Sequence, residues 1–338
     1  MAKTADAVYP EAGRPVCSEM QTYDTIYGQI TAPDWSDDLI VRSLSVLGEW
    51  SYLEQQILAR LVRKGDVLWD GGAFLGTFGI GVAQIAGRSG QSLARLVAIE
   101  PGAELRPFLA NNLQRNATCD HMLVACAVGS AAGLLVPADV LAGNHGALAY
   151  HTTDKADEET PVVDCLPMWH LRERYGDYDI LKLDVEGMEV EALKGDFEFI
   201  RDRKPLIWAE CNEAMSSLLL LEALVAAGYA PHYLAFPAFR QANFHAQIDL
   251  PYPMAYEAAL LAAPPDRLAQ LDVSGLGEEI IVKSVTTSWD LRQALWATPR
   301  WAQPAWTTAS RAELIALLGH LTRGDSLGAF HKYQGVYK

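Results

Sequence analysis

Short apolar runs alternate with segments of helical periodicity through the middle of the chain. This alternation predicts strands at 66–70, 95–100, 121–128, 178–185 and 205–210, and helices at 75–86, 103–116, 188–195 and 216–227. Two later apolar runs, 229–236 and 278–284, would complete a sheet. Buried strands that alternate with helices favour a mostly parallel sheet covered by helices on both faces, which is a doubly wound, Rossmann-like α/β fold.

The pattern changes at three places, which divide the chain. Residues 1–63 begin with a polar stretch, expected to be loose up to residue 37, and continue with helical periodicity at 38–63, expected to be a cap helix. Residues 130–163 interrupt the strand–helix rhythm with Gly, Asn, His and a charge cluster, which indicates an insertion with a hairpin and an exposed loop. A Trp-rich segment at 286–338 is expected to be a helical or irregular extension, which leaves 64–285 as the central domain.

The amino-acid composition excludes several classes of protein. Half of the 338 residues are hydrophobic, the formal net charge is −15, and no run of Lys or Arg occurs, which argues against a nucleic-acid partner. The five cysteines are scattered without a CxxC pair, so neither a disulfide framework nor a zinc ribbon is expected. No secretory signal or bilayer-length apolar run is visible, so we expect a soluble, cytoplasmic protein without a transmembrane segment. The oligomeric state stays open, a homo-oligomer included.

The stretch "VLWDGGAFLG" predicts a strand, a glycine turn and the start of a helix. In a doubly wound sheet, ligands bind beyond the carboxyl ends of the strands, near such a turn. Gly71, Gly72 and Gly76 do not fit the dinucleotide pattern G-x-G-x-x-G, because position 73 is Ala. A phosphate-binding Walker loop is also excluded, because Thr77 stands where that loop needs Lys.

Two acidic residues at predicted strand ends favour a ligand without phosphates. Asp70 would repel a pyrophosphate at the mouth of the turn, whereas it would attract the ammonium or sulfonium of S-adenosylmethionine. Glu100, followed by Pro101, ends the next strand, where a carboxylate can accept hydrogen bonds from two ribose hydroxyls.

A second group of charges lies in "DILKLDVEGMEVEALKG", residues 179–195. Strand alternation places Lys182, Asp184 and Glu186 on one face. Because buried parallel strands are normally apolar on both faces, charges at the carboxyl end of such a strand indicate a functional site. Glu189 falls in the first turn of the following helix, where an acid suits the helix dipole.

These segments, together with "VAIEP", the Asn pair at 111–112 and "KPLIWAECNE", resemble the FkbM family of S-adenosylmethionine-dependent methyltransferases over residues 48–285. The resemblance implies a class I methyltransferase domain at 64–285 and O-methylation of a hydroxyl, often on a sugar of a glycan, glycolipid or antibiotic. Phe74 departs from the family, which usually has Asn there, and Gly71 replaces a small apolar residue. The implied cofactor contacts are Asp70, Gly71, Gly72, Phe74, Gly76, Thr77, Glu100, Pro101 and Asn112.

Methyl transfer to a hydroxyl requires an aligned acceptor oxygen and a group that removes its proton. Asp184 is the first candidate for that base, Glu186 the second, and Glu210 ends the next strand and would share the site. Clustered carboxylates raise one another's pKa, which would let a base act near neutral pH. Asp184, Glu210 and Asn212 would also offer three oxygen ligands to Mg²⁺ or Ca²⁺.

Three other functions remain open at this point. The first is an NAD-dependent oxidoreductase, which the glycine spacing and Asp70 oppose. The second is a module that binds S-adenosylmethionine without catalysis and regulates or scaffolds a partner. The third is a methyltransferase for small molecules outside glycan chemistry, because a fold does not specify the acceptor.

Overall fold

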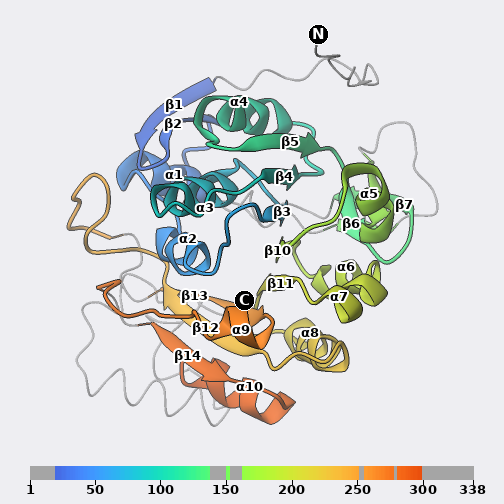
Figure 1. Cartoon of the computed structure of the whole chain (residues 1–338). Helices are drawn as coiled ribbons and strands as arrows, with labels where there is room; N and C mark the ends of the chain where they lie inside the picture. Colours follow the sequence, from blue (N-terminus) through green and yellow to red (C-terminus); the bar gives the residue numbers. More distant parts are fainter. Residues whose placement is uncertain (1–19, 138–149, 153–161, 251–254, 278–279, 299–338) are drawn as a thin grey trace, which may run out of the picture.

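The computed structural model describes residues 20–137, 150–152, 162–250, 255–277 and 280–298 (Figure 1). Its centre is an eight-stranded sheet in the order β14 (Ile281–Ser284), β12 (His232–Pro237), β13 (Tyr256–Ala262), β11 (Leu206–Glu210), β10 (Ile180–Leu183), β3 (Val67–Gly71), β4 (Arg95–Ile99), β5 (Asp120–Val124).

The sheet is mixed rather than mostly parallel. Strands β11, β10, β3, β4 and β5 pair in parallel, as the apolar runs predicted. Strand β13 was not predicted, and it lies antiparallel between β11 and β12. The edge strand β14 pairs antiparallel with β12.

Helices cover both faces of the sheet, and each face has its own hydrophobic core. One core packs α1 (Leu39–Val46), α2 (Tyr52–Ala59), α3 (Thr77–Arg88) and α4 (Arg106–Asn116) against the sheet. The other packs α5 (Met168–Tyr175), α6 (Glu189–Lys194), α7 (Phe197–Arg203), α8 (Met215–Ala226) and α10 (Ser288–Trp296) against the opposite face. Strand alternation divides the side chains: Leu68 enters the first core and Trp69 the second. The predicted two-faced α/β architecture is therefore confirmed.

The N-terminal part is more ordered than the sequence suggested. The expectation of a loose segment is wrong for residues 20–33, which form the antiparallel hairpin of β1 (Met20–Thr25) and β2 (Gly28–Pro33), packed against α4. The single helix predicted at 38–63 is two helices, α1 and α2. The chain breaks between them where Gly48 and Ser51 adopt positive φ angles of 72° and 44°, which no helix tolerates.

The predicted insertion contributes β7 (Gly133–Pro137) and β8 (Tyr150–Thr152) to a separate four-stranded sheet in the order β6 (Ala127–Gly129), β9 (Val163–Pro167), β7, β8. Strand β6 is the end of the run 121–128, which was predicted as one strand and instead forms β5 and β6. Strands β7 and β8 pair antiparallel, as expected for a hairpin, and the predicted exposed loop lies outside the described residues. At the C-terminal end, α9 (Pro265–Leu268) and α10 are described, whereas residues 299–338 of the Trp-rich extension lie outside the described part.

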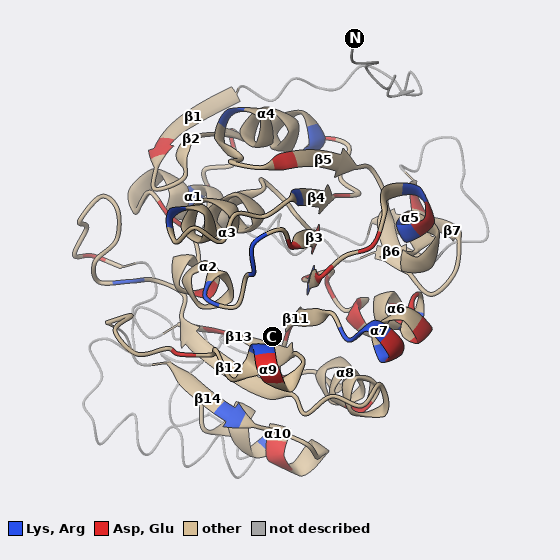
Figure 2. Cartoon of the chain, in the orientation of Figure 1, with Lys and Arg blue, Asp and Glu red and all other residues tan. Residues whose placement is uncertain are grey.

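The connections define where a ligand can bind. From β3 the chain proceeds outward to β4 and β5, and it then returns to β10 on the other side of β3. The strand order therefore reverses between β3 and β10, and the carboxyl ends of strands at such a switch point are the usual ligand site of an open α/β sheet. Figure 2 shows acidic residues, in red, at the ends of these two strands. None of the helices in the described part of the chain has the length and apolar character that a membrane-spanning helix requires.

Candidate functional site

The glycine turn after β3 is shaped by the close approach of β10. Gly72 has φ 74°, and a Cβ atom at this position would overlap the carbonyl oxygen of Asp184. Gly76 has φ 82° and is the N-cap of α3, which begins at the buried Thr77. The space around Gly71 is also restricted, because a Cβ atom at this position would lie 3.2 Å from the carbonyl oxygen of Lys182. Only glycine satisfies both the conformation and the space at residue 72.

Glu100 is tied to this turn by two backbone hydrogen bonds. The N–H of Phe74 donates to its Oε2 and the N–H of Gly102 to its Oε1, both at 2.8 Å. The side chain is buried, with 6% of the residue exposed, and burial raises its pKa to about 7 in spite of these bonds. A carboxylate has about four lone-pair sites, so two stay available for further donors. Pro101 is half-buried beside it.

Asp70 ends β3 but faces the protein interior. It is fully buried, its Oδ2 accepts a hydrogen bond of 3.2 Å from the N–H of Gly79, and its Oδ1 lies 3.2 Å from Nζ of Lys182. Burial raises the pKa of Asp70, and the ammonium of Lys182 opposes this effect. Asp70 therefore anchors α3 and a lysine, so the structure does not support the predicted direct contact with a ligand's cation.

Lys182 lies on the charged face that the sequence predicted, but the sequence assigned no role to it in the site. Its buried ammonium donates to the carbonyl oxygen of Gly72 at 3.0 Å and forms ion pairs with Asp70 and, at 3.4 Å, with Asp184. Burial disfavours this charge, but the carboxylates of Asp70, Asp184 and Glu54 outweigh burial and raise the lysine pKa. Lys182 thus links the glycine turn to the acidic end of β10.

Acidic residues gather beyond the ends of β10 and β11. The side chain of Asp184 is 42% exposed. Burial, with added repulsion from Asp184 and Glu189, raises the pKa of Glu186 to about 8. Burial also raises the pKa of Glu210 well above its ordinary value, and the charges of Asp184, Glu186 and Glu257 add to the rise. The structure therefore brings together the three carboxylates that the sequence predicted, and β13 adds Glu257 to them.

Two further glutamates support this region. Glu54, from α2, accepts hydrogen bonds from Nε1 of Trp208 at 2.6 Å and from Oγ of Ser51 at 3.2 Å. Its pKa is raised to about 7 by burial, and it interacts with the charges of Lys182 and Asp184. Glu189 is buried and accepts from the N–H groups of Val185 and Gly187, at 3.1 and 3.2 Å, so it braces the loop that follows β10. Each of these residues belongs to a helix, and its sequence context is that of an ordinary solvated acid. Their contacts become apparent only in the folded structure.

Asn112 has a different place from the one expected. Its Oδ1 accepts from the N–H and the hydroxyl of Thr31, at 2.8 and 2.9 Å. Its Nδ2 donates to the carbonyl oxygens of Thr31 and Leu75, at 2.9 and 3.0 Å. These four bonds use the full capacity of the buried amide. The structure thus gives no support to a cofactor contact by Asn112, which instead fastens β2 to the glycine turn.

The predicted metal ligands are not part of a recognisable metal centre. Among the described residues, no three or more His, Cys, Asp or Glu side chains are grouped so that they could hold an ion. Asn212 forms a hydrogen bond with the Glu210 side chain. The magnesium site at Asp184, Glu210 and Asn212 therefore stays a prediction without support.

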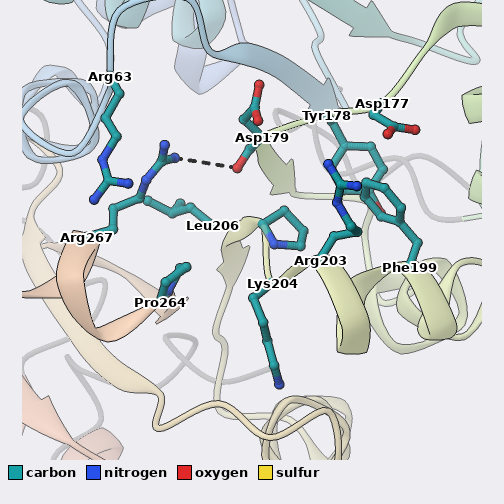
Figure 3. A pocket seen from close by; sticks show the side chains of 11 residues that line it. Arg63, Asp177, Tyr178, Asp179, Phe199, Arg203, Lys204, Leu206, Pro264 and Arg267 are labelled. Atoms are coloured by element: carbon teal, nitrogen blue, oxygen red, sulfur yellow. Dashed lines mark hydrogen bonds between the residues drawn. The ribbon is translucent and has the colours of Figure 1, made fainter.

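A pocket of about 200 Å³ lies at the opposite end of the sheet (Figure 3). Its charged lining comes from residues that precede the strands or follow β13, namely Arg63, Asp177, Asp179, Arg203, Lys204 and Arg267. Arg267 donates to the carbonyl oxygen of Asp179 at 3.5 Å, and both oxygens of Asp66 accept from it at 2.9 Å. Because the length of β10 separates this pocket from the switch point, the pocket is not part of the site at Asp184, Glu186 and Glu210.

Known proteins resemble this chain in sequence and in structure. Residues 78–231 match the model of the methyltransferase FkbM domain. The chain is similar to the solved structure of methyltransferase FkbM from Methylobacillus flagellatus KT, with 19% identity, a TM-score of 0.41, and coverage of 62% of this chain and 47% of that protein. The chain thus spans about half the length of that protein. No curated protein matches the sequence at a significant level.

Other solved structures also resemble the chain. Precorrin-6y C5,15-methyltransferase from Geobacter metallireducens GS-15 is 13% identical, with a TM-score of 0.36 and coverage of 62% of this chain and 88% of that one. M. jannaschii TYW2 in complex with AdoMet is 10% identical, with a TM-score of 0.35 and coverage of 76% and 88%. The mixed sheet with helices on both faces is an α/β fold. Residues 78–231 are therefore a methyltransferase FkbM domain.

Proposed function

We propose that the chain transfers the methyl group of S-adenosylmethionine, the cofactor that the family implies, to a hydroxyl oxygen of a sugar or a sugar-bearing natural product. The observation that carries this proposal is the group of carboxylates Asp184, Glu186 and Glu210 beyond the ends of β10 and β11. Carboxyl groups accept hydrogen bonds from several hydroxyls at once. The negative charge of Asp184 repels a phosphate-rich acceptor, which makes a neutral polyhydroxyl ligand the better match.

The residues around the glycine turn fit this cofactor. Glu100 keeps lone pairs for two ribose hydroxyls after its two backbone bonds. The twelve-residue α3 begins at Thr77 without a side-chain cap from Gly76, and Asp70 takes the N–H of Gly79, so the N–H groups of Thr77 and Phe78 are those that suit the carboxylate of the methionine moiety. Asp184 supplies a partly exposed negative charge for the sulfonium side. When bound, S-adenosylmethionine supplies an electrophilic methyl group.

We assign the proton-accepting role to Asp184. Its ion pair with Lys182, at 3.4 Å, holds one oxygen toward β3, while the side chain still reaches solvent. The pKa of Glu186 is raised to about 8, so near neutral pH its carboxyl group holds a proton and can both donate to and accept from further acceptor hydroxyls, and the pKa of Glu210 is raised by the same neighbouring charges. Asp184 would thus take the proton of one hydroxyl while its neighbours orient the remaining ones.

We further propose the domain division inferred from sequence, with residues 64–285 as the methyltransferase domain. Residues 20–63 belong with it structurally, because β2, α1 and α2 contribute to the core on the α3 face. The hydrogen bonds of Asn112 to Thr31 and Leu75 support the same association. The extension after residue 285 contributes α10 to the opposite core.

Two measurements test the proposed function in order. Calorimetry with S-adenosylhomocysteine, with NADH as the control ligand, is expected to show micromolar binding of the first alone and loss of that binding in Glu100→Ala. Transfer of a radiolabelled methyl group is then measured on neutral sugar acceptors, with and without Mg²⁺. We expect Asp184→Asn to keep S-adenosylhomocysteine affinity and to lose about 100-fold or more in turnover, the range for a general base.

Asp177→Asn, just before the other end of the same strand, is the matched control and should leave turnover unchanged. Turnover by Asp184→Asn at the wild-type rate would remove Asp184 from the proposal. Binding without transfer to any acceptor would favour a non-catalytic module, and preference for NADH would overturn the cofactor assignment.

A further inference from the structure

Phe74 occupies a strained position in the glycine turn. Its φ angle is 49°, in the left-handed region that bulky side chains avoid and that glycine or asparagine enters more easily. The conformation is fixed from both sides, because Gly72 and Gly76 also have positive φ angles and the N–H of Phe74 is bound to Glu100. Strain of this kind persists where the surroundings enforce it, and it concentrates at functional sites. An aromatic ring here therefore needs a reason beyond the shape of the turn.

The ring of Phe74 packs against Trp35. The ring centroids are 6.4 Å apart with an interplanar angle of 32°, and both side chains are half-buried. Trp35 follows β2, and its backbone is held by hydrogen bonds of its N–H to Pro33 and of its carbonyl oxygen to Asp38, at 2.8 and 3.0 Å. The two aromatic residues thus come from segments that are 39 residues apart in sequence.

Asn112 joins these two segments into one unit. It binds Thr31, four residues before Trp35, and the carbonyl oxygen of Leu75, directly after Phe74. The amide is fully buried, so its bonds are shielded from competition by water. The aromatic pair is therefore held by the fold itself rather than by a chance contact of two surface rings.

Phe74, one member of the aromatic pair, contacts Glu100, the residue that we assign as the acceptor for the ribose hydroxyls. The N–H of Phe74 donates a hydrogen bond of 2.8 Å to Oε2 of Glu100, so the residue that carries the ring is itself in contact with that carboxylate. A third aromatic residue, Tyr150 of β8, has its pKa raised to about 12 by burial and by the charge of Glu100. A base attached to a ribose at Glu100 would thus meet aromatic surface on the side of Phe74.

We propose that Phe74 and Trp35 form an aromatic wall on which the adenine of the cofactor stacks, and that the strain at Phe74 is maintained for this surface. The inference rests on the proposed function, because it takes Glu100 as the ribose acceptor. Stacking of a base on an aromatic side chain is worth about tenfold in affinity or more. Trp35 supports the Phe74 ring from the side of β2 and extends the wall.

The test is calorimetry with S-adenosylhomocysteine and with adenosine on wild type, Phe74→Asn and Phe74→Tyr. Asparagine accepts the left-handed conformation but offers no ring, so we expect both ligands to bind about tenfold more weakly. Tyrosine keeps the ring and the strain, so its affinity should stay within about twofold of wild type. Because adenosine lacks the methionine moiety, an equal loss for both ligands assigns the effect to the adenine end.

Ala246→Asn is the matched control, since Ala246 also has a positive φ of 53° but lies in an exposed loop. Relief of strain there should leave affinity unchanged. Thermal unfolding shows whether Phe74→Asn is folded, and Trp35→Leu, expected to weaken both ligands, provides an independent variant.

Wild-type affinity in Phe74→Asn, with binding lost in Glu100→Ala, would overturn the aromatic wall and leave the proposed function intact. Failure of wild type to bind S-adenosylhomocysteine would instead overturn the proposed function, and the aromatic wall with it.

Discussion

Replacement of Glu100 by Gln should change how the stability of the protein depends on pH. In the folded protein, burial raises the pKa of Glu100 from its ordinary 4.5 to about 7. An unfolded chain therefore releases this proton near pH 4.5, whereas the folded chain keeps it until about pH 7. Because the unfolded state binds fewer protons in this window, the free energy of unfolding falls as the pH rises.

The magnitude follows from the width of the window. Each pH unit between the two pKa values lowers the free energy of unfolding by about 1.4 kcal/mol, which gives about 3 kcal/mol once the pH exceeds 7. Glu100 is 6% exposed, so screening by solvent reduces this figure little. Glutamine resembles the protonated acid and does not ionise. Between pH 5 and pH 8, wild type should therefore lose about 2–3 kcal/mol more than Glu100→Gln.

Urea unfolding of both proteins at pH 5, 6, 7 and 8, followed by circular dichroism, measures this difference directly. Glu191→Gln is the control, because Glu191 is an exposed acid paired with Lys194 at 2.6 Å, and its pKa is lowered by that contact. A constant gap between wild type and Glu100→Gln across this pH range would refute the reasoning. It would mean that Glu100 is already ionised in the folded protein at pH 5.

Three further substitutions test the contacts around the turn. Lys182→Met should lower the free energy of unfolding by about 3–5 kcal/mol in urea, because it leaves a buried carboxylate without its cation; a loss under 1 kcal/mol would contradict the assigned ion pair. Asn112→Ala removes four buried hydrogen bonds and should cost about 3–5 kcal/mol, whereas Asn111→Ala, which removes one bond to Thr31, should cost about 1 kcal/mol in the same assay. Gly72→Ala should prevent folding or lower the thermal midpoint by more than about 10 °C, while Gly65→Ala, with φ 92° and nothing within 4 Å of its added Cβ, should lower it by only a few degrees.

The sequence predicted the strands whose side chains are buried on both faces, because such strands are short apolar runs between turn signals. It did not predict β13, whose residues "YEAALLA" are rich in alanine and leucine and carry no period of two. The pairing of β13 with both β11 and β12 decides its conformation, and that pairing is a tertiary effect. In the β1–β2 hairpin, exposed and half-buried positions alternate along the first strand, and Gly28, which follows the turn, has a positive φ angle.

The candidate site was predictable to the extent that it lies at strand ends. Asp184, Glu186 and Glu210 follow apolar runs directly, so parallel pairing brings them together. Lys182 lies in β10, two residues before Asp184. Only the structure shows that its side chain reaches Asp70 across the β3–β10 pair. Glu54 and Glu257 come from elements outside the parallel strands, so no local pattern connects them with the site.

The position of β13 has a consequence for how the chain matures during synthesis. Strands β11 and β12 leave the ribosome first, but they are not neighbours, and each pairs with β13 instead. Until residues 256–262 have emerged, the outer edge of β11 stays open next to Glu210, whose partner in the register is Ala259. A nascent chain that stops before this strand therefore carries an unfinished site and an unpaired edge, which is the kind of surface that chaperones bind.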